Sequence, residues 1–544
     1  MKNIQIRNRF LTKGLIMIAV LTVFSATSCK KYTELNPINS FSEATAFSTP
    51  ASIELVMAGV YNTATVGTYN GTTGRGYPFG SASIIQAEMR GEDMVNLEAF
   101  YQITYESTIT SNTANNINMW SNLYALINQC NVLIEGVTAA AAKGTVTTAV
   151  ADQYAGEARF LRALAHHELV IDFCRPYVDG NGSNPGVPYR TVAITSIDKA
   201  QQGASVARGT VAQDYVNILA DLDFAESKLP ATRTALKITR ATQGAAIALK
   251  TRVKQHMEDW AGVIAEGTKL GTSAAAGPYT STIGSYSLTA SVDGPFSNFK
   301  DNTESIFSIE NGSASNGGVN GALPNMFGPA KNALTALVGR NLVATNPNLY
   351  NASFWVTGDT RRLLLQIQQT TTNALYFFNY KYRDPLNSTD YAPIIRYAEV
   401  LLNVAEAYSR TTALDTRALN LLNAVRNRAV PVANRFTIAN FASQTALTQA
   451  ILNERRVEFA GEGRRWPDIT RLSQNASFAV PGGGIPAKVL KANIAGDGSG
   501  YNTTTRPVTT NGKAAIAYTD IHYIWPIPLD ELNANPNIAQ NPGY

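Results

Sequence analysis

Amphipathic helical stripes that recur along the chain constrain its fold most strongly. In the clearest stripe, apolar residues step by three and four from Val211 to Leu229, as one buried face of an α-helix requires. This helix is predicted to open at a Thr210-x-x-Gln213 capping box and to stop at Pro230. The spacing therefore predicts one well-defined helix between Thr210 and Pro230.

Similar stripes come in pairs before and after this helix. They predict helices around residues 120–134, 154–169, 245–253, 260–270, 394–408 and 418–425. The pair lengths and the small alanines at the expected crossings are typical of tetratricopeptide-like solenoids, although the period is not maintained. Between residues 272 and 390 the sequence becomes rich in Gly, Ser, Asn and aromatic residues. We predict a mainly α fold in which tetratricopeptide-like helix pairs form a scaffold and a loop-rich α+β region packs on it.

These changes of texture predict five segments. They are residues 1–28, a lipoprotein signal peptide; 29–50, a lipid-anchored tether and the start of the N-terminal region; 51–271, an N-terminal helical region; 272–390, a loop-rich variable region; and 391–544, a C-terminal region with further tetratricopeptide-like helices.

The charge of the chain is low and nearly balanced. Only 16% of its 544 residues are charged, and four of the positive charges behind the formal net charge of +5 lie in the first thirteen residues. The rest of the chain carries a net charge of about +1, which is too little to favour binding of nucleic acid. Such a neutral, polar surface favours uncharged ligands.

The N-terminus has the features of a lipoprotein signal. A basic start precedes the apolar run Leu15–Phe24, which is too short to span a bilayer. Small residues then lead to Cys29, as in a bacterial lipobox, although Ala26 stands where Leu is usual and Ser28 where Gly or Ala is. We predict cleavage before Cys29 and acylation of its thiol and amino group, which would anchor the chain in a membrane. Ordinary secretion is the alternative.

The two remaining cysteines are predicted to be buried free thiols. Cys130 and Cys174 fall on predicted helices joined by a loop near residues 137–149. In an antiparallel hairpin Cys130 would face roughly residue 156, about 27 Å along the helix from Cys174 and beyond disulfide reach.

The sequence predicts no catalytic residue, no cofactor and no metal. His166 and His167 are adjacent, so they cannot chelate one ion from one helix face, and His256 and His522 have no partner nearby in sequence. The turn Asp179–Asn184 places oxygen side chains as a calcium loop does, but it lacks the glycine and the glutamate that such loops need. An Asx-rich turn is favoured there.

The most chemically suggestive stretch is Ile451–Arg471, which holds nine charged residues and a tryptophan. It contains the carboxylates Glu454, Glu458 and Glu462 and the arginines Arg455, Arg456, Arg464, Arg465 and Arg471. It could form an active site or a buried girdle of ion pairs. A general acid needs a raised pKa, whereas neighbouring arginines such as Arg455 and Arg456 would keep these carboxylates ionised. Structural ion pairing is therefore favoured. Glu92 and Asp93 form the other dense acidic site.

Aromatic residues in loop-rich segments are candidates for stacking against sugar rings. They are Tyr69, Tyr77, Phe100, Tyr101, Phe296, Phe299, Trp355 and Tyr376. The predicted ligand contacts are Tyr69, Tyr77, Tyr101, Phe296, Trp355 and Tyr376, and for each one a place in the core is the alternative reading.

Several blocks of the chain resemble the SusD/RagB family of outer-membrane nutrient-binding lipoproteins. They are the lipobox-like Cys29, Gly156–Ala165, Pro393–Tyr408, Ile451–Arg471 and Trp525–Tyr544. The resemblance implies a scaffold of tetratricopeptide-like helices, attachment by lipid to the outer membrane, and a SusC-like TonB-dependent transporter as partner. It implies ligand binding without chemistry. Among functional residues it carries over only Cys29, the lipidation site.

The leading hypothesis is a cell-surface lipoprotein that binds an oligosaccharide and delivers it to a SusC-like TonB-dependent transporter. The low charge favours a neutral sugar. The alternatives are a peptide-binding lid of the RagB type, an exported glycoside hydrolase, and a solenoid scaffold for envelope assembly.

Overall fold

The computed structural model describes residues 43–69, 71, 73–330, 338–369 and 375–544. The chain divides into two compact units, residues 1–53 and 54–544. Of the first unit, the structure describes α2 (Glu43–Ala46) and the start of α3 (Pro50–Val66). Cys29 and the predicted signal peptide lie outside the described residues.

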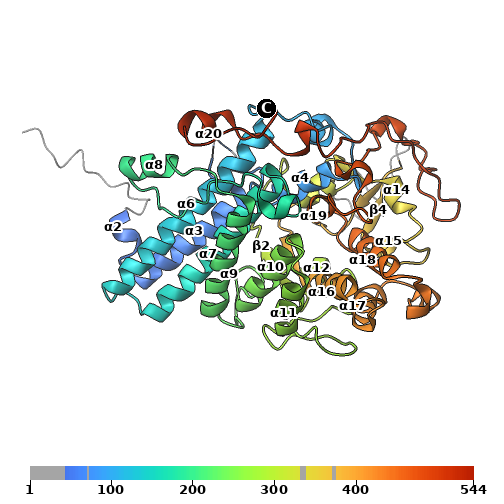
Figure 1. The fold of residues 1–544 in the computed structure, drawn as a ribbon, viewed down its shortest axis with the longest axis horizontal. Helices are drawn as coiled ribbons and strands as arrows, with labels where there is room; N and C mark the ends of the chain where they lie inside the picture. Colours follow the sequence, from blue (N-terminus) through green and yellow to red (C-terminus); the bar gives the residue numbers. More distant parts are fainter. Residues whose placement is uncertain (1–42, 70, 72, 331–337, 370–374) are drawn as a thin grey trace, which may run out of the picture. The chain divides into compact units, whose positions relative to one another are not determined.

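Long helices packed on their neighbours in sequence form the scaffold of the second unit (Figure 1). They are α6 (Ala114–Ala142), α7 (Thr148–Phe173), α9 (Val211–Lys228), α10 (Gln243–His256), α11 (Trp260–Lys269), α16 (Tyr397–Thr411), α17 (Thr416–Arg426) and α18 (Gln444–Glu458). Helix α6 packs on α7, α7 on α9, α9 on α10, and α10 on α11, while α16 contacts α11, α17 and α18. The predicted mainly α fold of paired helices is confirmed.

Local signals fix the ends of these helices. The Thr210 side chain accepts a hydrogen bond from the Gln213 amide at the start of α9, and α9 ends at Lys228, two residues before Pro230. The Thr147 and Thr242 side chains cap α7 and α10 in the same way. The predicted boundaries of α9 are therefore confirmed, with the hydroxyl cap as their physical cause.

Shorter elements fill the rest of the chain. The short helices are α4 (Ala82–Arg90), α5 (Gln102–Tyr105), α8 (Ile197–Ala204), α12 (Gly294–Ser297), α13 (Leu323–Phe327), α14 (Pro347–Tyr350), α15 (Arg361–Leu364), α19 (Arg465–Leu472) and α20 (Leu529–Ala534). Within the described residues, three two-stranded antiparallel sheets pair β1 (Met94–Asn96) with β3 (Val343–Thr345), β2 (Ser305–Ile309) with β6 (Ala392–Arg396), and β4 (Gln366–Gln368) with β5 (Phe377–Asn379). The second sheet joins the loop-rich segment to the start of α16.

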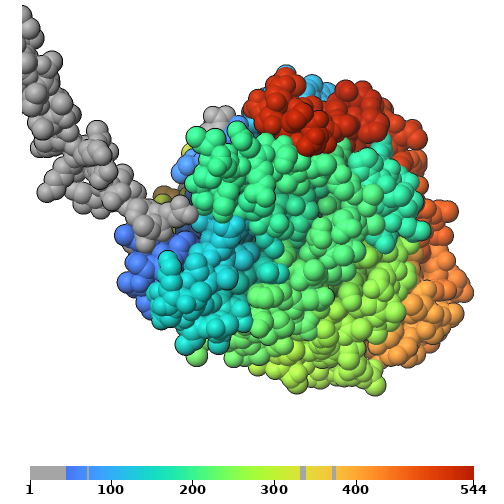
Figure 2. Space-filling view, turned by 60° about the vertical axis from the view of Figure 1, so that its left-hand side comes forward, coloured from blue at the N-terminus to red at the C-terminus, as the bar shows by residue number. Residues whose placement is uncertain are grey.

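The C-terminal segment lies on the surface beside the helices, in red at the top of Figure 2. Polar contacts hold it there. Arg190 pairs with Glu531 at 2.6 Å, and the side-chain amide of Asn541 donates to the carbonyl oxygens of Phe173 and Trp525.

Two further predictions about single residues can be compared with the structure. Cys130 and Cys174 are free and buried, as predicted. In the Asp179–Asn184 turn, the Asp179 carboxylate accepts a hydrogen bond from the Tyr518 hydroxyl, and the Asn184 amide donates to the Asp179 carbonyl oxygen. Among the described residues, no group of three or more His, Cys, Asp or Glu side chains is placed to hold a metal ion.

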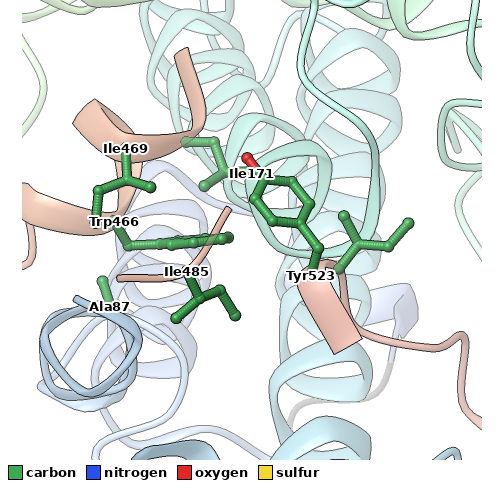
Figure 3. Packing of buried hydrophobic residues seen from close by; sticks show 7 residues of the cluster. Ala87, Ile171, Trp466, Ile469, Ile485 and Tyr523 are labelled. Atoms are coloured by element: carbon green, nitrogen blue, oxygen red, sulfur yellow. The ribbon is translucent and has the colours of Figure 1, made fainter. Parts of the chain in front are cut away.

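Trp466 is the centre of a buried apolar cluster (Figure 3). The cluster joins α4, α7, α19 and the C-terminal region through Ala87, Ile171, Trp466, Ile469, Ile485, Tyr523 and Ile524. The Arg90 guanidinium lies 3.7 Å from the centre of the Trp466 ring and pairs with Asp172 at 2.8 Å. A cation held between a ring and a carboxylate can be buried because both partners compensate for lost water.

The carboxylates of Ile451–Arg471 are buried in a network of ion pairs, so the predicted structural role is confirmed. The predicted partners of the three glutamates are wrong, because adjacent residues on a helix point in different directions, whereas Asp468 pairs with Arg455 and Arg471 of the stretch itself. Glu454 pairs with Arg361 and Arg426, and Glu462 with Lys381 and Arg396.

Glu458 lies at the centre of this network. It pairs with Arg361, Arg396 and Arg428. Burial alone would raise the pKa of Glu458, but the charges of Arg396 and Arg428 hold it at about 2. The carboxylate is therefore ionised at neutral pH.

The arginines of the same stretch reach other elements instead. Arg455 pairs with Asp468 at 2.9 Å, Arg465 with Glu92 at 2.5 Å, Arg471 with Glu406 at 2.8 Å, and Arg456 with Glu92 and Asp93. Glu92 and Asp93, the other dense acidic site of the sequence, therefore belong to the same girdle. Helix α18 ends at Glu458, and Gly461 and Gly463 follow with φ of 79° and 72°, a turn that other residues would strain.

Glu88 differs from the paired carboxylates described above, because one of its two oxygens has no partner among the described residues. One of its oxygens accepts a hydrogen bond from the Gly463 amide at 2.8 Å, and the other has no partner among the described residues. Glu88 borders a cavity of about 10 Å³, which has room for one water molecule. Burial, and then the charge of Asp93, raises the pKa of Glu88 to about 8.

Replacing Arg396 by Ala is expected to lower the free energy of unfolding by about 3–5 kcal/mol, because it leaves Glu458 and Glu462 buried with too few partners. Urea unfolding measures this loss. The control is Arg417→Ala, whose side chain is 48% exposed and should cost less than about 1 kcal/mol. Equal losses in the two variants would refute a special role for the buried network.

Glu88→Gln is expected to flatten the dependence of stability on pH. Because the folded pKa of about 8 lies above the ordinary value of 4.5, folded Glu88 keeps a proton that the unfolded chain releases, so the free energy of unfolding falls as pH rises through that window. The variant has no such proton. Urea unfolding at several pH values between about 5 and 9 compares it with the wild type.

The control for this experiment is Glu135→Gln, since the Glu135 side chain is half-exposed, pairs with Lys199 and accepts a hydrogen bond from the Ala193 amide. It should leave the pH dependence unchanged. A Glu88→Gln variant that loses stability with pH as steeply as the wild type contradicts the assignment.

Candidate functional site

Four chain segments far apart in sequence meet in a loop-built surface, which we call the Phe100 face. It consists of the described residues of 67–77, 98–103, 312–322 and 338–340. Its exposed side chains include Arg75, Phe100, Ile103, Val319 and Val338. Phe100 is 38% exposed, which is unusual for a large aromatic residue and leaves its ring available to a ligand.

Helix α6 positions the first of these loops. The Asn122 side chain accepts hydrogen bonds from the amides of Thr68 and Tyr69, at 2.9 and 3.1 Å. Gly67, with φ of 71°, lies so close to Asn122 that a Cβ atom would collide with its side chain. The loop therefore has a defined path even though it lies at the surface.

The first and third segments are pressed together backbone to backbone. A Cβ atom on Gly321 would lie 2.4 Å from the carbonyl carbon of Arg75, so only glycine allows this approach. The Ser81 hydroxyl donates to the Gly321 carbonyl oxygen, and Gly76 packs on Ser81. Arg75 is thereby held beside the loop that carries Asn320.

The third and fourth segments meet over the Phe100 ring. The Arg340 guanidinium donates to the Asn320 side-chain oxygen at 2.8 Å and lies 5.1 Å from the centre of the Phe100 ring. The Arg340 amide donates to the Asn325 carbonyl oxygen at 2.7 Å. Phe100 in turn contacts Tyr101 edge to face, with ring centres 4.9 Å apart. A cation, an amide and an aromatic ring are therefore held in one arrangement.

Three of the six predicted ligand contacts belong to this face. Tyr69 is half-buried on the first loop, whereas Tyr77 and Tyr101 lie just beneath the surface, each 6% exposed. Burial, and then the neighbouring Tyr77, raises the pKa of Tyr101, as expected for two hydroxyl groups that lie close together. The structure thus brings Tyr77 and Tyr101 together, while Tyr69 lies on the loop that Asn122 holds.

The other three predicted contacts lie in the core of the loop-rich region. Phe296 contacts Tyr382 beside the ion network, Trp355 packs on Tyr350, and Tyr376 packs on Phe378. Phe296, Trp355 and Tyr376 are all buried. That all six residues contact ligand remains a prediction, and burial supports the core reading for these three.

Sequence reasoning missed three residues of the Phe100 face, namely Arg75, Asn320 and Arg340. Phe100 was recognised only as one of several loop aromatics. The run Thr73-Gly-Arg-Gly-Tyr77 was the available signal, because two glycines beside an arginine indicate a tight loop that presents one charged side chain.

Two hollows also lie among the described residues. One of about 250 Å³ is lined by Tyr61, Asn62, Leu236, Arg240 and Glu310, among others, and adjoins the face through Gly312 and Ser315. The other, of about 230 Å³, lies between α6 and α20 and is lined by residues that include Tyr124, Arg190 and Glu531. Their charged groups pair within the protein, as Arg240 does with Glu54 and Arg190 with Glu531.

Carboxyl groups with raised pKa values do occur, although the sequence did not reveal them. Burial raises the pKa of Asp214 and of Glu168 to about 7, and that of Glu88 to about 8. Asp214 and Glu88 are each only 1% exposed, so a polymeric substrate cannot reach them. Asp214 and Glu88 are therefore proton-binding but interior, which does not suit a glycosidase acid, and Glu168 is half-buried.

Comparison with known proteins identifies the family at both ends of the chain. The family model described as "SusD family" matches residues 365–544, and one described as "Starch-binding associating with outer membrane" matches residues 39–254. SusD-like protein P2 of Formosa agariphila is 32% identical over 162 residues, which are 29% of this chain and 26% of that protein. SusD-like protein P38 of the same organism is 24% identical over 98% of this chain and all of the relative.

Solved structures share the whole fold. A SusD superfamily protein from Bacteroides fragilis is 26% identical, with a TM-score of 0.72 over 90% of this chain and 99% of that one. A laminarin-binding SusD-like protein is 21% identical, with a TM-score of 0.63 over 91% of this chain and all of that one. Sequence matches to both ends and a shared fold between them agree: the chain is a SusD-like protein.

Proposed function

We propose that this protein is a cell-surface binding protein for an oligosaccharide and that the Phe100 face holds the ligand. The observation that carries the proposal is the exposed Phe100 ring, fixed beside Asn320 and Arg340. A sugar ring has an apolar face that packs on an aromatic ring and hydroxyl groups that bond to amide and guanidinium groups. The laminarin-binding relative supports this ligand class.

The composition of the Phe100 face favours binding without hydrolysis. Glycoside hydrolysis needs two carboxyl groups on either side of the scissile bond. The four segments of the face contain one acidic residue, Glu98, which pairs with Lys491 at 2.7 Å. A peptide ligand of the RagB type is the second candidate, since Asn320 and Arg340 could also bond to a peptide backbone.

We further propose that Cys29 carries the lipid anchor and that the protein delivers its ligand to a SusC-like TonB-dependent transporter. Among the described residues, no helix is both long and apolar enough to cross a membrane. The family description places such proteins in association with the outer membrane. Acyl chains on Cys29 would supply that association, with each buried methylene contributing about 0.8 kcal/mol.

Phe100→Ala is expected to weaken glycan binding at least about tenfold, or about 1.4 kcal/mol, because it removes the stacking surface. Calorimetry of residues 30–544 against a panel of glycans that includes laminarin oligosaccharides measures the affinity. Stability should change little, since the ring is partly exposed.

The control for the stacking surface is Leu363→Ala, which removes an apolar side chain that is 79% exposed and lies outside the Phe100 face. It should bind as the wild type does. Unchanged affinity in Phe100→Ala would place the ligand elsewhere on the molecule, and turnover of any bound glycan would refute binding without chemistry.

Cys29→Ala is expected to fold normally and to leave the membrane fraction, because the acylated thiol is lost. Fractionation of cells that express the full chain measures this, with Cys130→Ala as the matched control that stays in the membrane. Membrane retention of the Cys29→Ala protein would disprove lipidation at this residue.

A further inference from the structure

The Phe100 face is locally basic, although the protein as a whole is nearly neutral. Arg75 is exposed and makes no hydrogen bond or ion pair with the described residues. Arg340 bonds to the neutral Asn320 side chain and pairs with no carboxylate among them. Glu98, the only acid in the four segments, is neutralised by Lys491. Two positive charges therefore remain uncompensated beside Phe100.

The two arginines are both held by the 312–322 loop. The Arg75 backbone is pressed on Gly321, and the adjacent Asn320 accepts the hydrogen bond from Arg340. Both charges also act on the same buried hydroxyl: burial raises the pKa of Tyr101, and the charges of Arg340 and Arg75 lower it. Both guanidinium groups therefore act on the Tyr101 hydroxyl, and that of Arg340 also lies 5.1 Å from the centre of the Phe100 ring.

We propose that the Phe100 face takes an acidic glycan, a sugar chain that bears carboxylate or sulfate groups. This inference rests on the proposed function and specifies its ligand class. A guanidinium group matches the paired oxygens of a carboxylate or sulfate, while Phe100 packs on the apolar face of a sugar ring. A neutral sugar would use the ring and leave both charges unpaired.

This ligand class replaces the neutral sugar that the composition favoured. The low charge of the whole chain is an average, and most described cations of the interior are matched by acids, as Arg396 is by Glu304, Glu458 and Glu462. The charges in those interior ion pairs are therefore not available to bind a ligand. The unmatched charges at the face decide which ligand it attracts.

The test compares matched glycans by calorimetry on residues 30–544. The probes are an unsulfated β-glucan oligomer, its sulfated form, and an oligogalacturonate. We expect at least one acidic probe to bind at least about tenfold more tightly than the neutral one in about 50 mM salt. We expect that advantage to shrink in about 500 mM salt, where charges are screened.

Variants assign the effect to the two arginines. Arg75→Gln and Arg340→Gln should each weaken binding of the acidic probe at least about fivefold. Arg75→Gln should weaken binding of the acidic probe more than binding of the neutral β-glucan, so the ratio of the two affinities should fall, because the variant removes a charge and keeps a hydrogen-bonding side chain. Arg435→Gln, an exposed arginine outside the face, is the control and should bind every probe as the wild type does.

Each other outcome has a distinct meaning. Neutral and acidic glycans that bind equally, without salt dependence, would overturn this inference and leave the proposed function standing. If both variants still bind the acidic glycan as tightly as the wild type does, the Phe100 face is not its binding site. Inorganic polyphosphate that binds as tightly as the acidic glycan would show general anion capture and overturn the glycan assignment. Failure of every glycan to bind would overturn the proposed function itself.

Discussion

The buried contact between Arg396 and Glu458 is the interaction on which the rest of the structure depends. Arg396 ends β6, immediately before α16, and Glu458 ends α18, so their pairing fixes the C-terminal helices to one another. Glu304 also pairs with Arg396, which ties the loop-rich segment to the same point. That segment has only short helices and strands. Charge pairing there replaces the large apolar interface that longer helices would supply, and a partner removed from such a network leaves a buried charge.

A continuous path of contacts leads from this network to the Phe100 face. Lys381 pairs with Glu462, and a few residues later the Pro385 carbonyl oxygen accepts a hydrogen bond from the Asn325 side chain. The Asn325 carbonyl oxygen accepts from the Arg340 amide. The cation over the Phe100 ring is therefore positioned through backbone and side-chain contacts that end on the scaffold. Surface loops supply the candidate ligand groups, and the buried charges supply their fixed position.

Local sequence signals predicted the parts of the fold that local forces determine. The stripe of α9, its hydroxyl cap and its end before a proline are all set by residues a few positions apart. That the charged residues of Ile451–Arg471 form ion pairs was predictable, because so many charges on a partly apolar helix must be paired. Their partners were not, since Arg361 and Glu454 are 93 residues apart and only the fold brings them together. The Phe100 face was still harder, because the approach of Arg75 to Gly321 is a contact between two loops with no periodic pattern.

Stability and ligand choice are carried by different residues in this architecture. The ion network and the Trp466 cluster are interior, so their substitution changes the free energy of unfolding before it changes any surface. Arg75 and the Phe100 ring contribute little to the core, and close glycine contacts together with the Asn122 hydrogen bonds hold the loop of Arg75 in place. Side chains on the face can therefore change while the backbone beneath them stays fixed. A single scaffold of this kind can present an acidic, neutral or basic binding surface, and the charges at the face, not the net charge of the chain, determine which ligand is selected.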